Sequence, residues 1–169
     1  MYIPPNALRL AGFALGHAAE VAASLNEDEL ICPFAFIEKE GQRVQFAFES
    51  DSQLTSVKGG IERIKESPEI WDHWAFVWEG FINQQNKRTD ALIVQFGFKR
   101  QMLPNQLVYP FLKTFSPKSF RLIGNPWLMV GSNIQEESDW EFEKELIMSG
   151  IAQHETAGSQ WATWIDHGS

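Results

Sequence analysis

The sequence has a single cysteine and few basic residues. Cys32 has no second cysteine to pair with, which predicts a reducing, cytoplasmic compartment. Only 14 lysines and arginines stand against 22 aspartates and glutamates, so the net charge is −8. Nucleic acids and anionic membranes both attract clustered positive charge, and we therefore expect neither as a partner. We expect Cys32 itself to be a small buried residue beside Pro33.

Long apolar runs and catalytic signatures are also lacking. Arg9, His17 and Glu20 interrupt the N-terminal apolar stretch, and we expect neither a signal peptide nor a membrane span there. The chain has no phosphate loop, dinucleotide fingerprint or G-x-S-x-G motif. Its histidines show no paired spacing typical of a preformed metal site, and His154 and His167 fall in a predicted solvated tail. We therefore predict no metal and no cofactor.

Aromatic residues are plentiful, with 13 phenylalanines and seven tryptophans in 169 residues. This length is typical of one domain, and aromatic side chains bury large areas in its core. We predict a single α+β domain over residues 1–169, in which residues 152–169 form a docking segment or a flexible tail.

The strongest pattern lies between Trp71 and Phe98, where two alternating apolar stretches flank a polar turn. Alternation with period two is typical of a half-buried antiparallel hairpin. We assign Trp74, Phe76 and Trp78 to one face of its first strand. The second strand then places its even positions on one face: Leu92, Val94, Phe96 and Phe98.

An earlier helix and hairpin precede this one in the same order. Apolar spacing predicts a helix over residues 7–25 with Asn6 as its N-cap. A hairpin over residues 30–49 turns at Glu40–Gly41, and we expect Phe36 to face Phe46 across it. Gly12 and Gly16, one turn apart in the helix, either admit a neighbouring backbone or simply weaken the helix.

Ser52 is predicted to cap a second helix, which stops at Ser67–Pro68. Gly59–Gly60 predicts a bend in it, or a later start. Helix and hairpin thus occur twice, which indicates two αββ units.

Two further strands are predicted over residues 107–115 and 120–131, joined by a turn at 116–119. Pro110 indicates an edge strand or irregular pairing there. A C-terminal helix capped by Ser138 follows, with Glu141 completing a capping box. The predicted fold is therefore α+β: a predominantly antiparallel sheet of five to six strands, with helices packed on one face.

The second face of this predicted sheet carries small apolar residues, where a solvated face normally carries charged ones. Three explanations are open: the C-terminal elements cover this face, it forms a homodimer interface, or it lines a ligand pocket. The residues assigned to it are Ala35, Ile37, Ala47, Ala75, Val77, Ala91 and Ile93.

Candidate catalytic residues are confined to the central hairpin. His73 is a candidate general base, with Glu79 or Asp90 as its acidic partner. Opposite parity separates Glu79 from Asp90, so we expect only a bulge at Gly80 to bring them together. Arg88 and Asp90 are equally well explained as turn residues.

The candidate binding residues are aromatic or cationic. Trp78 and Arg88 lie on the central hairpin, and Trp161 and Trp164 share one face of a C-terminal helix. Tryptophan is enriched at binding hot spots, although docking of Trp161 and Trp164 onto their own domain explains them too.

These patterns favour a non-enzymatic protein-interaction module, in an inhibitor, immunity-type or adaptor role. Its partner is a basic protein that meets exposed acids such as Glu137, Asp139 and Glu141, or a second copy of the chain. The alternatives are a small-ligand carrier with an apolar pocket and a hydrolase-type enzyme using His73.

Overall fold

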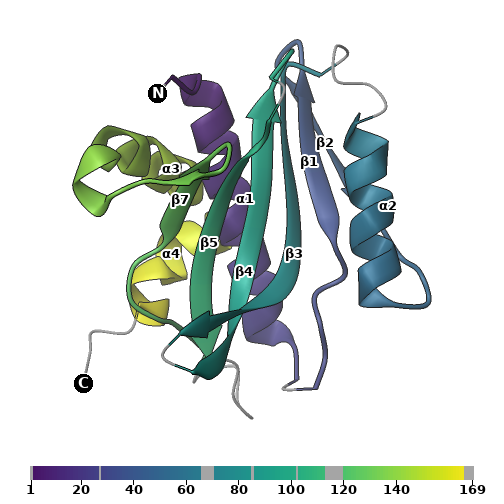
Figure 1. Ribbon diagram of the computed structural model, residues 1–169, viewed down its shortest axis with the longest axis vertical. Helices are drawn as coiled ribbons and strands as arrows, with labels where there is room; N and C mark the ends of the chain where they lie inside the picture. Colours follow the sequence, from purple (N-terminus) through teal and green to yellow (C-terminus); the bar gives the residue numbers. More distant parts are fainter. Residues whose placement is uncertain are drawn as a thin grey trace.

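The computed structural model describes residues 2–26, 28–65, 71–84, 86–101, 103–112 and 120–165. Two helix–hairpin units come first, followed by a third long strand, three short strands and two C-terminal helices (Figure 1). The elements are α1 (Pro5–Ser24), β1 (Phe34–Lys39), β2 (Gln42–Ala47), α2 (Gln53–Lys65), β3 (His73–Gln84), β4 (Lys87–Phe98), β5 (Asn105–Leu112), β6 (Arg121–Leu122), β7 (Trp127–Val130), β8 (Asn133–Ile134), the 3₁₀ turn η2 (Glu137–Asp139), α3 (Glu141–Gln153) and α4 (Glu155–Trp164).

The sheet has the strand order β2-β1-β3-β4-β5-β7-β8, and β6 pairs separately with β5. Every pair of named strands is antiparallel. The α+β fold class and the antiparallel sheet are thus confirmed. The strand count is higher than the predicted five to six because residues 121–134 divide into three short strands.

Both hairpins close through two-residue turns, and this sets their register. Lys39 pairs with Gln42 across the Glu40–Gly41 turn, where both turn residues have positive φ angles of 51° and 79°. These angles are typical of the type I′ turn that favours hairpins. Across a two-residue turn, an odd-numbered residue of one strand always pairs with an even-numbered residue of the other. Two even-numbered residues on the two strands therefore lie on opposite faces of the sheet.

Three predicted facings are wrong for this reason. Phe36 pairs with Gln45, and Phe46 pairs with Ala35 instead. In the central hairpin Phe76 pairs with Gln95, so the aromatic face of β3 is opposite to the face that Phe96 occupies on β4. The predicted second face is likewise split, because Ala75 and Val77 share the face of Phe34 and Phe36, while Ala35, Ala91 and Ile93 lie on the other.

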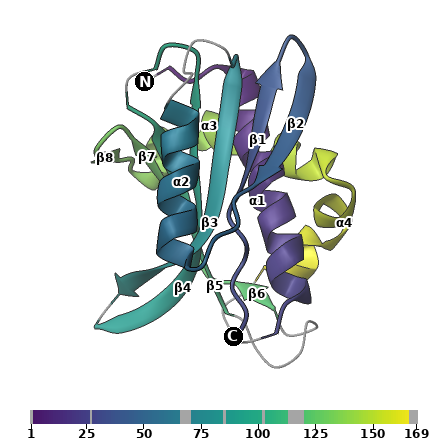
Figure 2. The same cartoon turned by 90° about the vertical axis from the view of Figure 1, so that its right-hand side faces the viewer.

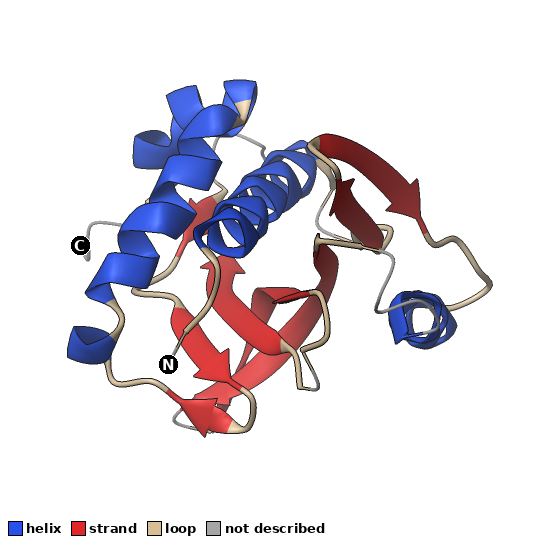
Figure 3. Cartoon of the chain, turned by 90° about the horizontal axis from the view of Figure 1, so that it is seen from above, coloured by secondary structure: helices blue, strands red, loops and turns tan. Residues whose placement is uncertain are grey.

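Helices α1, α3 and α4 cover the face that holds the larger core (Figure 3). Helix α1 buries eleven residues there, and α3 crosses it at very close range. A Cβ on Gly12 would collide with the backbone of Ile147, and one on Gly150 with the backbone of Arg9. The close-approach interpretation of Gly12 is therefore confirmed.

Helix α2 covers part of the opposite face, so the helices do not all lie on one side as predicted. Figure 2 places α2 and α1 on opposite sides of β3. Ala35, Ile64 and Phe76 form the smaller core on the α2 side. The register points the large side chain of Phe76 away from α1, and helix α2 buries it on the opposite face of the sheet.

Several predicted boundaries change. Helix α1 begins at Pro5 without a side-chain cap, since proline already has a helical φ angle and lacks the N–H that a cap would satisfy. Ser138 lies in η2, and the buried Trp140 occupies the N-cap position of α3 without a side-chain hydrogen bond, so the predicted Ser138 cap is wrong. The predicted cap of α2 is confirmed, because Ser52 Oγ accepts the backbone N–H of Thr55 at 3.2 Å, and the helix runs unbroken from Gln53 through Gly59–Gly60.

The segment predicted as a docking segment or flexible tail is helical as far as Trp164. The predicted stop at Ser67–Pro68, the turn at 116–119 and His167 lie outside the described residues. Pro110 lies in β5 between its pairings with β7 and β6, which is the irregular pairing expected. Among the described residues, no helix has both the length and the apolar character needed to cross a membrane.

Candidate functional site

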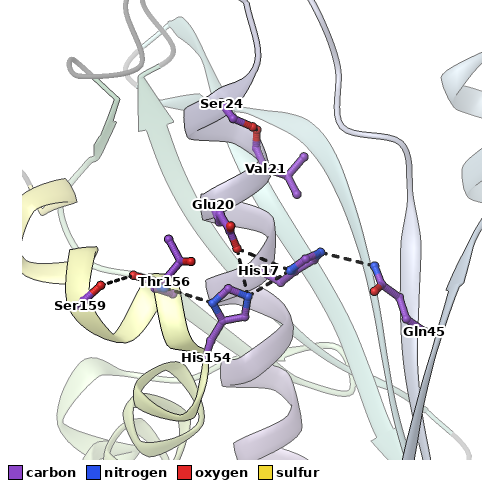
Figure 4. A network of polar contacts seen from close by, with 9 residues as sticks. His17, Glu20, Val21, Ser24, Gln45, His154, Thr156 and Ser159 are labelled. Carbon is purple, nitrogen blue, oxygen red and sulfur yellow. Dashed lines mark hydrogen bonds and ion pairs between the residues drawn. The ribbon is translucent and has the colours of Figure 1, made fainter.

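Two histidines far apart in the sequence meet beside a carboxylate on one side of α1 (Figure 4). His17 Nδ1 lies 3.0 Å from His154 Nε2. Glu20 Oε2 lies 3.2 Å from His154 Nε2 and 3.9 Å from His17 Nδ1. We call His17, Glu20 and His154 the histidine cluster.

Helix geometry and close packing assemble this cluster. His17 and Glu20 are three residues apart on α1 and therefore share a face. His154 occupies the junction between α3 and α4, where the chain leaves one helix and enters the next. This junction can approach α1 because Gly16 has no side chain; a Cβ there would lie 2.9 Å from that of Ala157.

The contacts of His154 fix where its proton lies. Its Nδ1 accepts the backbone N–H of Ala157 at 3.1 Å and thereby caps α4. A neutral ring whose Nδ1 accepts must carry its proton on Nε2. That proton points at His17 Nδ1 and Glu20 Oε2, so His17 Nδ1 is an acceptor and its own proton lies on Nε2.

Nε2 of His17 lies 3.4 Å from the side-chain amide of Gln45. The nearer amide atom is the nitrogen of Gln45, which is a donor, so the assigned proton of His17 is accepted only when this amide is flipped to present its oxygen. Burial lowers the pKa of His17, the nearby His154 lowers it further, and Glu20 partly opposes both. His17 is therefore largely neutral at pH 7, the form that binds protons or metal ions.

His73, the predicted general base, lies in a different place. Its Nδ1 is 3.6 Å from Glu38 Oε1, and Glu38 also forms an ion pair of 3.0 Å with Arg43. Burial alone would raise the pKa of Glu38, but the hydrogen bonds and charges of His73 and Arg43 outweigh it and lower the pKa. Arg9 and Asp72 help to line the polar pocket of about 290 Å³ around them.

The predicted acidic partners are not beside His73. Glu79 pairs with Leu92 in the middle of the hairpin, and Asp90 pairs with Phe81 toward its tip, whereas His73 begins β3. The register also places Glu79 and Asp90 on the same sheet face, so the predicted bulge is not needed to bring them to one side. The carboxylate in reach of His73 is Glu38, contributed by the neighbouring strand β1.

The candidate binding residues divide into two groups. Arg88 is exposed, and its guanidinium stacks 3.9 Å from the ring centre of Phe81, itself 51% exposed. Trp78 is half-buried against Phe76.

The other group, Trp161 and Trp164, is buried within the domain. Their rings contact those of Tyr109 and Phe120, with centroids 6.0 and 5.7 Å apart. In this structure they dock onto their own domain, the second of the two explanations.

A pocket of about 400 Å³ lies between residues 123–127 and residues 134–140, next to several exposed carboxylates. Its walls include Trp127, Ile134 and Trp140, and Glu136 and Glu137 lie at its edge. We call the surface formed by this pocket and residues 134–145 the acidic surface. The predicted interaction residues Glu137, Asp139 and Glu141 all belong to it and are exposed.

Cys32 is exposed, not buried as expected, because β1 begins only after it. Partial burial and the nearby Glu49 raise the pKa of its thiol, which keeps the less nucleophilic protonated form.

Comparisons of this chain with protein families, curated proteins and solved structures find no match. The site must therefore be interpreted from its geometry. Sequence reasoning missed the histidine cluster and Glu38. The spacing of His17 and Glu20 on one helix was a visible signal, but the approach of His154, 137 residues away, depends on helix packing.

Proposed function

We propose that the chain is a non-enzymatic protein-interaction module that binds a basic partner through its acidic surface. The observation that supports it is the combination of exposed carboxylates with exposed apolar side chains around one pocket. Ile134 and Phe142 are each 65% exposed, and Glu136, Glu137 and Glu141 lie close to them in the sequence. Apolar contact supplies affinity at such a surface, while charge directs association.

The chain's own Lys144 illustrates the chemistry of this surface. Its ammonium lies 3.4 Å from Glu137 Oε1 and 4.8 Å from the ring centre of Trp140. Trp140 is buried, so a lysine or arginine of a partner would meet the exposed carboxylates, as Lys144 meets Glu137. The partner we propose therefore presents basic side chains next to apolar ones.

Charge favours such a partner over the alternatives. A second copy of the chain carries the same net charge of −8, and nucleic acid is also anionic, so both meet repulsion at this surface. The pocket opens to solvent beside Glu136 and Glu137, unlike the enclosed apolar cavity that suits a small-ligand carrier. The proposal includes a cytoplasmic location, supported by the single exposed thiol of Cys32.

The first experiment is native mass spectrometry of the protein purified gently from its own host. The proposal expects a mass above the 19.3 kDa of the chain, contributed by a basic protein that dissociates as salt is raised. A bare monomer at every salt concentration would count against a stable complex, and a doubled mass would indicate a homodimer.

A pair of charge-matched variants then locates the binding surface. Glu137→Lys with Glu141→Lys reverses two charges on the acidic surface, and we expect loss of the partner and a weaker salt dependence. Asp51→Lys with Glu62→Lys makes the same charge change at and near α2, at the opposite end of the sheet from β7 and α3 (Figure 1), and should retain the partner. Equal loss in both variants would mean that only net charge matters.

One observation favours a second candidate, a hydrolase-type enzyme. His73 has a carboxylate beside it inside a polar pocket, as a general base requires, although Glu38 takes the role predicted for Glu79 or Asp90. A purified protein that hydrolyses ester or phosphoester substrates, and loses this activity in His73→Gln but not in Asp90→Asn, would support it.

A further inference from the structure

We propose that the histidine cluster is a binding site for a divalent transition-metal ion, with Zn²⁺ as the ion to test. His17 Nδ1, Glu20 Oε2 and His154 Nε2 are separated by 3.0, 3.2 and 3.9 Å. Ligand atoms about 2.0–2.1 Å from a tetrahedral Zn²⁺ lie roughly 3.3 Å apart. Two of the three separations are close to that value, and a small movement of Glu20 toward His17 would complete one face of a coordination tetrahedron.

The surrounding side chains hold both rings in place. The ring of His17 meets the rings of Phe34 and Phe36 edge-on, with centroids 5.1 and 5.6 Å away. The ring of His154 packs 5.2 Å from that of Phe13. Such packing fixes ring orientation before any ion arrives, which reduces the loss of side-chain entropy on binding.

Access and charge also suit an ion. The side chain of His154 is only 10% exposed, but those of His17 and Glu20 are 26% and 38% exposed, so the cluster can be reached from solvent. Two neutral imidazoles and one carboxylate would leave a bound divalent ion with a single positive charge. Imidazole nitrogen favours Zn²⁺ and its neighbours in the transition series over Mg²⁺ and Ca²⁺, which prefer oxygen.

The two histidines are not equally ready to bind. The Nδ1 lone pair of His17 already points into the cluster, where it accepts from His154 Nε2. The Nε2 proton of His17 gains an acceptor, an outer contact typical of metal-bound histidines, when the Gln45 amide is flipped to present its oxygen. His154 carries its proton on the nitrogen that faces the ion, because Nδ1 accepts from Ala157. Binding therefore requires the proton of His154 to move from Nε2 to Nδ1, with no net proton released.

This tautomer change links the ion to helix α4. Once Nδ1 of His154 carries a proton, it can no longer accept the N–H of Ala157, and the cap of α4 opens. The buried Trp161 and Trp164 lie on the same helix and would sense a change in its first turns. The proposed site is thus one in which metal binding and the start of α4 compete for one imidazole.

The test is a titration of chelator-treated full-length protein with ZnCl₂ by isothermal calorimetry. We expect saturable binding of one ion per chain. His17→Asn and His154→Asn should each weaken binding at least about 100-fold, since outer-shell changes alone cost about 10–100-fold. Asparagine at position 154 can still cap α4, so this variant removes the imidazole and keeps the helix start.

Two further variants keep the result interpretable. Glu20→Gln alters a partly exposed side chain outside the core and should weaken binding while leaving the fold unchanged. His73→Asn removes a histidine that lies beside a carboxylate elsewhere, and it should bind Zn²⁺ like the wild type. Absence of saturable binding in the wild type, or wild-type affinity in His17→Asn and Glu20→Gln, would overturn the site.

Amide NMR during the same titration tests the link to α4. The Ala157 amide should shift in proportion to bound Zn²⁺, because its acceptor is withdrawn. An unchanged Ala157 amide at saturation would overturn this link and show that His154 binds without giving up the cap.

Discussion

The ring of Phe76 is completely buried between the sheet and α2, where it contacts Phe48 and Trp78. Replacing it with alanine removes most of the smaller core, and we expect Phe76→Ala to lower the free energy of unfolding by about 3–5 kcal/mol. Phe81→Ala is the matched control, because Phe81 is 51% exposed, and it should cost less than about 1 kcal/mol. Urea denaturation of both variants measures the difference; similar losses would mean that Phe76 is not a core residue.

Replacement by alanine should change the stability of the protein in opposite directions at two adjacent glycines of α2. A Cβ on Gly59 meets open space, so Gly59→Ala should stabilise the protein by up to about 1 kcal/mol through helix propensity. A Cβ on Gly60 would collide with the ring of Phe76, so Gly60→Ala should destabilise it despite the same gain. Thermal melting of the pair gives the sign of each effect, and a rise in both would contradict the contact between α2 and β3.

His17 makes stability depend on pH in a defined direction. Its pKa in the folded protein is below the ordinary value of 6.5, so the unfolded chain binds this proton more tightly. The contribution of His17 is therefore present above pH 6.5 and is lost as the pH falls toward the lowered pKa. The groups that face its ring nitrogens are His154, Glu20 and Gln45.

NMR titration of the histidine rings measures this shift directly. We expect the pKa of His17 to lie below 6.5 in the wild type and to fall further in Glu20→Gln, because that carboxylate raises it. In His154→Asn it should rise, since one source of repulsion is removed. A pKa of His17 at or above 6.5 in the wild type would contradict its burial.

At the scale of elements, the start of α4 depends on one side chain. His154→Ala removes the acceptor for the Ala157 N–H and should cost about 1 kcal/mol, within the usual range of about 0.5–2 kcal/mol for a lost N-cap. His154→Asn restores an acceptor and should recover much of that loss. Chemical denaturation of the two variants separates capping from ring packing, because both lack the imidazole.

The hairpins show how far local sequence could predict this fold. Alternation and the Glu40–Gly41 turn were enough to predict both hairpins and their order. The predicted facing of their side chains was wrong because it placed even-numbered residues of both strands on one face. The two-residue turn instead pairs the even-numbered Phe36 with the odd-numbered Gln45. Once that count is made, the aromatic face of β3 and the apolar face of β4 must lie on opposite sides.

The candidate sites were harder to predict than the strands. His73 meets Glu38 only because β1 pairs with β3, and His154 meets His17 only because Gly16 and Gly12 let the C-terminal helices approach α1. Such contacts depend on how elements pack, which a single sequence does not contain. Of the predicted serine caps, Ser52 is confirmed by its bond from the Thr55 N–H, whereas Ser138 lies in η2 and α3 has no side-chain cap.

In the described part of the chain the two faces of the sheet are covered unequally: three helices pack on one face and α2 is the helix on the other (Figure 3). Helix α1 buries eleven residues, whereas α2 buries only Ser56, Gly60 and Ile64. Local stability follows buried apolar contact, so α2 should open in a separate, lower-energy event while α1 persists until global unfolding.

Native-state hydrogen exchange tests this difference. We expect the amides of α2 to exchange with a free energy well below the global value and with little dependence on the stability of α1. Phe76→Ala should lower the protection of α2 further, because that ring is its main contact with the sheet. Ile147→Val is a mild change in α3, which packs against α1 on the other face of the sheet. It should therefore leave the free energy of α2 opening unchanged. Equal protection of α1 and α2 would mean that the two covers unfold as one unit and that the sheet couples its faces tightly.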